Sequence, residues 1–219
     1  MSNFEKTIAV IGGTGGLGSA LAFRLGKTGY KIFIGSRTEI KAQNSAKKLN
    51  IRLGKEIVSG YVNLQAAKKA EVIILTIPFS NHTEIIEEIK EEVQGKIVVD
   101  TTVPLIPPKV SRVQLPSGGS AAKLAQEKLG QNVRLVSAFQ NVAATSLESG
   151  DNVKGEVLVC GNNVDARSEV ISLIESIGLK GWHAGPIDNS VVTESLTPVL
   201  IFLNKRYKLG GSGISIVEH

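Results

Sequence analysis

The chain has 219 residues, of which 42% are hydrophobic and 21% are charged, and its formal net charge is +5. No uninterrupted apolar stretch approaches the roughly 20 residues that a membrane-spanning helix needs, and the polar N-terminal residues 1–7 lack the apolar region of a signal peptide. Lysines and arginines are scattered among acidic residues and form no basic run with interleaved aromatics. The composition therefore favours small anionic ligands over nucleic acid or a membrane surface.

The residue types that form disulfides or bind metals are sparse and isolated. Cys160 is the single cysteine, which excludes an intramolecular disulfide and favours a reducing, cytoplasmic compartment. It lies in the strand-like run 156–161, where we expect a buried and inert thiol. His82, His183 and His219 lack metal-ligand spacing, so no metal site is predicted.

Apolar strand-like runs alternate with helical patterns through the first part of the chain. The expected strands are residues 7–12, 31–35, 57–61, 72–77, 97–100 and 133–138. The expected helices are residues 15–27, 39–53, 64–70, 83–93 and 121–129. This alternation predicts an α/β fold of the Rossmann type, with a doubly wound parallel sheet.

The later segments depart from this alternation. Prolines in residues 104–119 predict a loop or an extended crossover, and residues 148–154 are polar and turn-like. The pattern then indicates a strand at 157–160, a helix at 165–177, an extended stretch at 179–184 and a helical tail at 189–203.

The segment after the first predicted strand has the glycine pattern G-x-G-x-x-G. In this pattern the first glycine permits a tight turn, the second lets a pyrophosphate approach the backbone, and the third lets helix and strand pack closely. Free N–H groups at the start of the helix then face the phosphates. The residues expected to bind a dinucleotide here are Gly13, Thr14, Gly15, Gly16, Leu17 and Gly18.

The end of the second predicted strand indicates which dinucleotide binds. NAD-binding domains place a carboxylate there to hold the ribose hydroxyls, but this chain has Ser36, Arg37 and Thr38, with Lys41 nearby. A guanidinium, two hydroxyls and a lysine suit a ribose phosphate dianion. The sequence therefore predicts NADP(H) rather than NAD(H), and the alternative is a turn with a solvated arginine.

The nicotinamide ring is expected at the same edge of the sheet. Ligands of open α/β sheets bind outside the carboxyl ends of the strands, where residues 12–18, 76–82 and 100–104 form loops. Small or apolar groups make a dry wall for a flat ring, and the residues expected to form it are Thr76, Ile77, Pro78 and Phe79. The alternative is that Pro78 merely terminates a strand.

These motifs, together with others in the C-terminal third, resemble one family, the NADPH-dependent coenzyme F-420 reductases (F-420:NADP oxidoreductases). The motifs are Gly12-Gly13-Thr14-Gly15-Gly16-Leu17-Gly18, Gly35-Ser36-Arg37, Leu75-Thr76-Ile77-Pro78, Val136-Ser137-Ala138, Val159-Cys160-Gly161, Ala184-Gly185-Pro186 and Glu194-Ser195-Leu196-Thr197-Pro198. The glycine motif occurs in many Rossmann proteins, whereas the last segment is far more specific. The resemblance covers nearly the whole chain.

The resemblance implies an enzyme that transfers a hydride between NADP(H) and the deazaflavin coenzyme F-420, with the two rings stacked. It also implies an NADP-binding Rossmann domain in residues 1–155, and a small, mainly helical lobe in residues 156–219 that completes the deazaflavin cleft and contributes a homodimer interface. Because the hydride passes directly between two bound cofactors, no catalytic acid, base or metal is expected, and the protein acts by positioning. The residues expected to touch both rings are Thr14, Ile77, Pro78, Phe79, Ala138, Val142 and Pro198.

The sequence departs from the family pattern after residue 138. Relatives often carry a histidine and then a proline there, where this chain has Phe139-Gln140-Asn141-Val142-Ala143. Gln140 does not titrate near neutral pH, which argues against a proton relay through it. We expect Asp100 to cap a strand end, and Glu194 and Ser195 to have structural or interface roles.

Two other functions stay open at this point. One is an NADPH-dependent reductase of another acceptor, such as a flavin, a ferric chelate or an imine, on the same fold. The other is a non-catalytic NADP-binding redox sensor.

Overall fold

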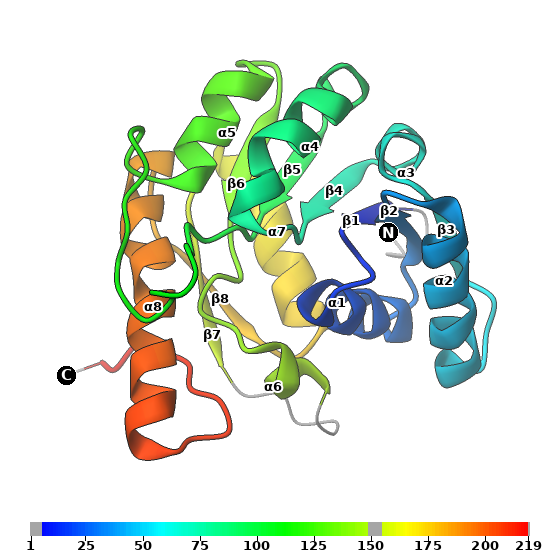
Figure 1. Cartoon of the computed structure of the whole chain (residues 1–219). Coiled ribbons are helices and arrows are strands. Elements are labelled where there is room, and N and C mark those ends of the chain that lie inside the picture. The colour runs from blue at the N-terminus through cyan, green and yellow to red at the C-terminus, as the bar shows by residue number, and fades with distance from the viewer. Residues whose placement is uncertain (1–5, 149–154, 219) are drawn as a thin grey trace.

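A twisted parallel sheet with helices on both faces forms the centre of the computed structural model, which describes residues 6–148 and 155–218 (Figure 1). The strand order is β3-β2-β1-β4-β5-β6, and every neighbouring pair is parallel. The strands are β1 (Thr7–Ile11), β2 (Lys31–Ser36), β3 (Val58–Val62), β4 (Val72–Leu75), β5 (Ile97–Asp100) and β6 (Arg134–Ser137). The predicted doubly wound α/β class is confirmed, and the strand order reverses between β1 and β4, where such sheets open a crevice.

Helices connect the strands and cover both faces of the sheet. They are α1 (Gly16–Lys27), α2 (Glu39–Leu53), α3 (Asn63–Lys69), α4 (His82–Ile89), α5 (Ala121–Leu129), α6 (Ala144–Glu148), α7 (Val164–Ser176) and α8 (Ser190–Tyr207). Among the described residues, no helix is both long enough and apolar enough to cross a bilayer.

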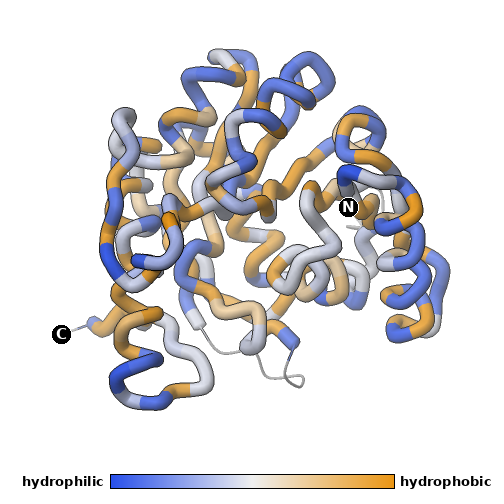
Figure 2. Tube along the Cα trace, in the orientation of Figure 1, coloured by the Kyte–Doolittle hydropathy of each residue, from blue (hydrophilic) through white to orange (hydrophobic). Residues whose placement is uncertain are grey.

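The two faces of the sheet bury separate apolar clusters. Ile8 and Val10 of β1 belong to a cluster with residues of α1, α2 and α7, whereas Ala9 and Ile11 belong to a cluster with residues of α3, α4 and α5. All four β1 residues are fully buried. Because side chains alternate between two covered faces, the central strands read as continuous apolar runs, which Figure 2 shows as hydrophobic colour along the sheet.

The C-terminal part of the chain continues from the same sheet. Strands β7 (Glu156–Val159) and β8 (Lys180–His183) form a parallel pair, and a bridge between Ser137 and Cys160 joins this pair to the end of β6. Val157 and residues of α7 belong to the apolar cluster that also holds β1 and α1. Helix α8 lies at the outer edge of the molecule, beside the loop that precedes α5 (Figure 1).

Several helices and strands begin or end at residues other than those predicted. Residues 83–93 form α4 followed by a 3-10 turn, Lys90–Val93, rather than one helix. Strand β4 ends at Leu75, two residues earlier than predicted, although the Thr76 N–H still donates to the Ile11 carbonyl of β1 over 2.9 Å. Helix α6 was not predicted, and α8 continues through Pro198 to Tyr207. Of the polar segment 148–154, residues 149–154 lie outside the described part of the chain.

Helix α2 packs against β3 with almost no space between their backbones. A Cβ atom added at Gly60 would lie 2.2 Å from the carbonyl carbon of Ala42 and 2.3 Å from the backbone nitrogen of Gln43. Backbone atoms in the middle of a helix cannot move away as a flexible side chain could. Glycine at this position therefore determines how closely α2 approaches the strand that follows it.

We expect Gly60→Ala to lower the free energy of unfolding by about 1–3 kcal/mol, because the added methyl group forces α2 away from the sheet. Urea denaturation monitored by circular dichroism measures this loss. Gly210→Ala is the control, since no atom lies within 4 Å of the added Cβ and its effect should stay below about 0.5 kcal/mol. An unchanged unfolding midpoint for Gly60→Ala would contradict the close packing.

Candidate functional site

A cleft of about 1030 Å³ opens at the carboxyl ends of the central strands. Its lining comes from the segments that follow all six strands of the sheet and from α8. The lining residues are Gly12, Thr14, Gly15, Leu17, Ser36, Arg37, Thr38, Lys41, Asn63, Thr76, Ile77, Pro78, Phe79, Ser80, Asn81, Ile85, Thr101, Thr102, Val103, Leu105, Pro107, Val110, Phe139, Gln140, Val142 and Thr197.

The glycine turn between β1 and α1 forms one end of the cleft. The positive φ of 74° lies at Gly12, so the tight turn is one residue earlier than the Gly13 that the sequence pattern indicated. Gly13 instead packs under the turn, where an added Cβ would lie 2.7 Å from the Val10 carbonyl oxygen. At Gly15 the nearest atom to an added Cβ is 3.4 Å away, which leaves the backbone open on the cleft side. This is the geometry that lets a pyrophosphate approach a helix N-terminus.

Helix α1 is held close to β4 by the third glycine of the pattern. An added Cβ at Gly18 would lie 2.5 Å from the Thr76 hydroxyl oxygen and 2.8 Å from the Cα of Gly13. The Thr76 hydroxyl in turn donates to the Ile11 carbonyl over 2.9 Å. The close helix–strand packing predicted for this glycine is therefore present.

The segment between β2 and α2 carries the cationic end of the cleft. Ser36 is nearly buried at the end of β2, whereas Arg37, Thr38 and Lys41 are exposed. Thr38 is the N-cap residue of α2, but its hydroxyl makes no capping bond and can bind a ligand. Among the described residues, neither Arg37 nor Lys41 forms an ion pair. Two cations without an ion pair at a helix N-terminus, whose first turn also holds the carboxylate of Glu39, make this end suited to a dianion.

The middle of the cleft is lined mainly by apolar and uncharged residues. Ile77, Pro78 and Phe79 follow β4 and form one wall. Phe139 and Val142 follow β6 and form the opposite wall. Phe139 has a φ of 72°, a conformation that costs a residue without glycine's freedom about 1–3 kcal/mol and that turns the chain sharply after β6.

The structure brings most, but not all, of the predicted binding residues to this cleft. Those that line it are Thr14, Gly15, Leu17, Ser36, Arg37, Thr38, Lys41, Thr76, Ile77, Pro78, Phe79 and Val142. Gly13 lies in the turn, and Gly16 and Gly18 lie in the first turn of α1; none of the three lines the cleft. Two expected ring contacts do not line the cleft: Ala138 is fully buried in the core beside β6, and Pro198 is buried on α8 against the loop after β5, beside a separate small cavity.

Comparison with known proteins places the chain in a family. The family model described as "NADP oxidoreductase coenzyme F-420-dependent" matches residues 7–104. An F-420-dependent NADP reductase of Methanocaldococcus jannaschii is 43% identical over 96% of this chain and 98% of its own length. The chain belongs to the F-420-dependent NADP oxidoreductase family. An F-420-dependent NADP reductase of Methanothermobacter marburgensis is 35% identical over 96% of this chain and 98% of its own length.

A solved structure confirms the fold of this family member. A crystal structure from Arthrobacter sp. FB24 superimposes with a TM-score of 0.80 and covers 96% of this chain and 99% of its own. Its sequence identity to this chain is 24%, so the likeness concerns the architecture alone. The Rossmann sheet and the C-terminal additions described above are therefore an arrangement that a second protein shares.

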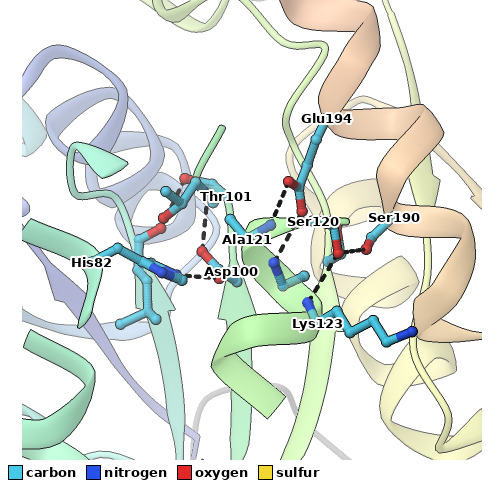
Figure 3. Close-up of polar contacts among 12 residues, drawn as sticks. His82, Asp100, Thr101, Ser120, Ala121, Lys123, Ser190 and Glu194 are labelled. Atoms are coloured by element: carbon cyan, nitrogen blue, oxygen red, sulfur yellow. Dashed lines mark hydrogen bonds and ion pairs between the residues drawn. The ribbon is translucent and has the colours of Figure 1, made fainter. Parts of the chain in front are cut away.

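A buried polar pair behind the cleft was not predicted from the sequence. His82 Nε2 lies 2.7 Å from Asp100 Oδ2, and the two side chains are 2% and 0% exposed (Figure 3). Asp100 Oδ1 also accepts a hydrogen bond from the Thr102 N–H over 2.9 Å. The histidines are scattered in the sequence, but His82 is not isolated in the fold. The available signal was that His82 follows one strand and Asp100 ends the neighbouring strand of a parallel sheet, and the carboxyl ends of such strands meet at one edge.

Glu194 has the structural role that the sequence predicted. Its carboxylate accepts hydrogen bonds from the N–H groups of Ala121 and Ala122, over 2.7 and 3.0 Å, and so caps α5 from α8 (Figure 3). The Ser120 hydroxyl accepts from the Lys123 N–H over 3.0 Å and completes the cap. Burial raises the pKa of Glu194 to about 8; the two N–H bonds lower it, and the nearby Asp100 charge raises it further.

Cys160 is buried as predicted. Burial raises the pKa of its thiol to about 11, because the thiolate would lose its hydration there. The positive charge of Arg167 opposes this increase without reversing it. A thiol held neutral in this way is a packing group rather than a nucleophile.

The raised pKa of Glu194 gives a pH dependence with a defined sign. The folded chain binds this proton up to about pH 8, whereas an unfolded glutamate releases it near its ordinary pKa of 4.5. Between these values unfolding releases a proton, so the contribution of Glu194 to stability falls as the pH rises. We expect the free energy of unfolding, measured in urea at pH 5 and at pH 8, to fall more for the wild type than for Glu194→Gln, which cannot titrate. Equal changes for the two proteins would contradict the raised pKa.

Proposed function

We propose that the cleft binds NADP(H) and coenzyme F-420 side by side and that the chain catalyses hydride transfer between them. The observation that carries this function is the similarity over nearly the whole chain to F-420-dependent NADP reductases. The described cleft supports it, since it joins a cationic end to an apolar centre at the switch point of a Rossmann sheet. A dinucleotide carrying an extra phosphate has this same distribution of charged and apolar groups.

The NADP(H) contacts follow the order of the strands. The ribose phosphate is assigned to Ser36, Arg37, Thr38 and Lys41, and the pyrophosphate to the glycine turn 12–18. The nicotinamide is assigned to the wall of residues 76–79, which follows β4. Strands β2 and β4 are the two neighbours of β1 in the sheet. The dinucleotide thus crosses the strand ends from β2 to β4.

The deazaflavin ring is assigned to the remaining part of the cleft. Val142, Phe139 and Gln140 line it from the segment after β6, and Thr197 lines it from α8. The Thr197 hydroxyl donates to the Gln140 backbone carbonyl over 2.6 Å, which ties α8 to this wall. This bond supports the proposal that residues 156–219 complete the site that residues 1–155 begin.

The chemistry needed from the protein is positional. NADPH supplies the hydride and F-420 accepts it together with a proton from solvent, and the reverse reaction returns both. The residues act by holding the reacting carbons about 3–3.5 Å apart. The apolar wall of Ile77, Pro78 and Phe79 excludes water from one side of the transfer. Effective concentrations reached by such positioning account for roughly 7–11 kcal/mol of a barrier in the best intramolecular cases.

A homodimer is the second part of the proposal. Helix α8 exposes Val192, Val199 and Phe202 to 59%, 46% and 54% of their surfaces. Their spacing places them on one side of the helix, and an exposed apolar stripe of this kind is typical of an interface. Sedimentation velocity of the purified chain measures its mass in solution, and a monomer at micromolar concentration would contradict this part of the proposal.

We expect the purified chain to reduce F-420 when NADPH is supplied, followed by the visible absorbance of the oxidised deazaflavin. Free flavin and a ferric chelate are the competing acceptors and should be reduced at least tenfold more slowly. Turnover of a competing acceptor in preference to F-420 would favour the alternative reductase. Tight NADPH binding without turnover of any acceptor would favour a redox sensor.

The phosphate assignment predicts a selective loss of affinity. Arg37→Ala should raise the Kd for NADPH roughly 10- to 100-fold, because it removes charge-assisted hydrogen bonds to the ribose phosphate, and should leave the Kd for NADH nearly unchanged. Fluorescence titration measures both constants. Arg52→Ala is the matched control, since Arg52 lies at the other end of α2, over the Phe23 ring, and should change neither. Equal losses for NADPH and NADH would contradict the assignment.

A further inference from the structure

Three segments that line the cleft converge on one buried residue, Asp100. Its Oδ2 lies 2.7 Å from His82 Nε2, and its Oδ1 accepts from the Thr102 N–H over 2.9 Å (Figure 3). Its backbone carbonyl accepts from the Gln140 side-chain amide over 2.8 Å and from the Ala138 N–H over 3.2 Å. Asp100 ends β5 and is fully buried, so its own position is fixed by the sheet.

Each of these bonds fixes a different wall of the cleft. His82 begins α4 directly after the 3-10 turn Phe79–Asn81, whose residues line the cleft. Thr102 and Gln140 line it from the segments after β5 and β6. The side chains of His82 and Asp100 are buried and are not among the lining residues. They can therefore influence bound ligands only through the segments that they hold.

Hydrogen bonds to both carboxylate oxygens hold the Asp100 side chain in one position. Carboxylate oxygens accept hydrogen bonds, so His82 Nε2 is the donor to Asp100 in this bond. A buried carboxylate keeps its full negative charge only when its oxygens find donors, and here both oxygens have one. Removing His82 would leave one oxygen without this donor, and the segment after β4 would lose its tie to β5.

We infer that His82 and Asp100 are positioning residues for hydride transfer, which set the spacing between the wall after β4 and the wall after β6. This inference rests on the proposed function, in which the nicotinamide lies on the first wall and the deazaflavin on the second. Hydride transfer depends steeply on the distance between the reacting carbons, and a misplacement of about 1 Å costs on the order of 100-fold in rate. A tie between the segments that carry the two rings therefore acts on the chemical step more than on binding.

Three variants test the tie. His82→Leu removes the hydrogen-bond donor, Asp100→Asn removes the charge while keeping an acceptor for Thr102, and His82→Gln keeps an amide donor near the position of Nε2. We expect His82→Leu and Asp100→Asn to lower kcat roughly 10- to 100-fold, with KM for NADPH changed less than about threefold. His82→Gln should recover most of the lost rate.

The primary kinetic isotope effect on kcat distinguishes positioning from stability, because a loss of stability alone would leave it unchanged. With NADPH deuterated at the transferred position, the isotope effect on kcat should rise in His82→Leu and Asp100→Asn, because hydride transfer becomes more rate-limiting. Gln126→Met is the matched control. Gln126 is another buried polar side chain that ties two segments, through the Gly130 and Val133 carbonyls, but it lies at the opposite edge of the sheet. It should lower the melting temperature and leave kcat and the isotope effect unchanged.

The outcomes separate this inference from the proposed function. A wild-type chain that does not turn over F-420 would contradict the proposed function itself. A wild type that turns it over, together with a folded Asp100→Asn that matches Gln126→Met in kcat and in isotope effect, would overturn the positioning role. If His82→Leu fails to fold, the comparison of Asp100→Asn with His82→Gln still decides, since the first should be slow and the second should not.

Discussion

The carbonyl groups at the carboxyl ends of the strands constrain the rest of this structure. A strand that ends in a buried edge leaves its last carbonyl in need of a donor. Here the residue after the neighbouring strand supplies it twice over: the Ile11 carbonyl accepts from both the N–H and the hydroxyl of Thr76, and the Leu75 carbonyl accepts from both groups of Thr101. The segments that leave β4 and β5 are thus tied to the strands beside them, β1 and β4. The walls of the cleft inherit the rigidity of the sheet, which suits a reaction that depends on distance.

The fold could be predicted from the sequence because its signals are local. Apolar runs of strand length, glycine spacing and helical periodicity each concern residues close in the chain, and the sheet they predict is the one observed. The residues at the phosphate end could be placed for the same reason, since Arg37 and Lys41 follow directly from the end of β2. The predicted and observed placements differ where the tertiary environment decides which way a side chain points. Ala138 was expected beside a ring, but the strand alternation points it into the core.

The pair of His82 and Asp100 shows why part of the site could not be predicted from the sequence. The sequence indicated that residues 76–82 and 100–104 lie at one edge of the sheet, but not which side chains meet there. That depends on the turn Phe79–Asn81, which begins α4 at His82 and buries the imidazole against β5. The contact that Glu194 makes could not be predicted from the sequence either. Its role as a cap for α5 requires α8 to cross the N-terminus of a helix about seventy residues earlier in the chain, a contact without a local signature.

The charges around the cleft also bear on which reaction it supports. Among the described residues that line it, only Arg37 and Lys41 are charged at neutral pH, and both lie at the end assigned to the ribose phosphate. The centre has threonine, glutamine and apolar side chains, and Gln140 occupies the wall after β6 without a proton to give near neutral pH. A reduction that must also protonate its product needs an acid within reach of the reacting atom. Reduction of a flat conjugated acceptor also takes up one proton overall, but the charge that the hydride brings is delocalised over the ring, and solvent supplies the proton after the transfer. An imine nitrogen must instead be protonated for the hydride to add, so the lining favours the flat conjugated partner. The buried imidazole and carboxylate behind the walls then act through geometry, because neither reaches the space where the rings would meet.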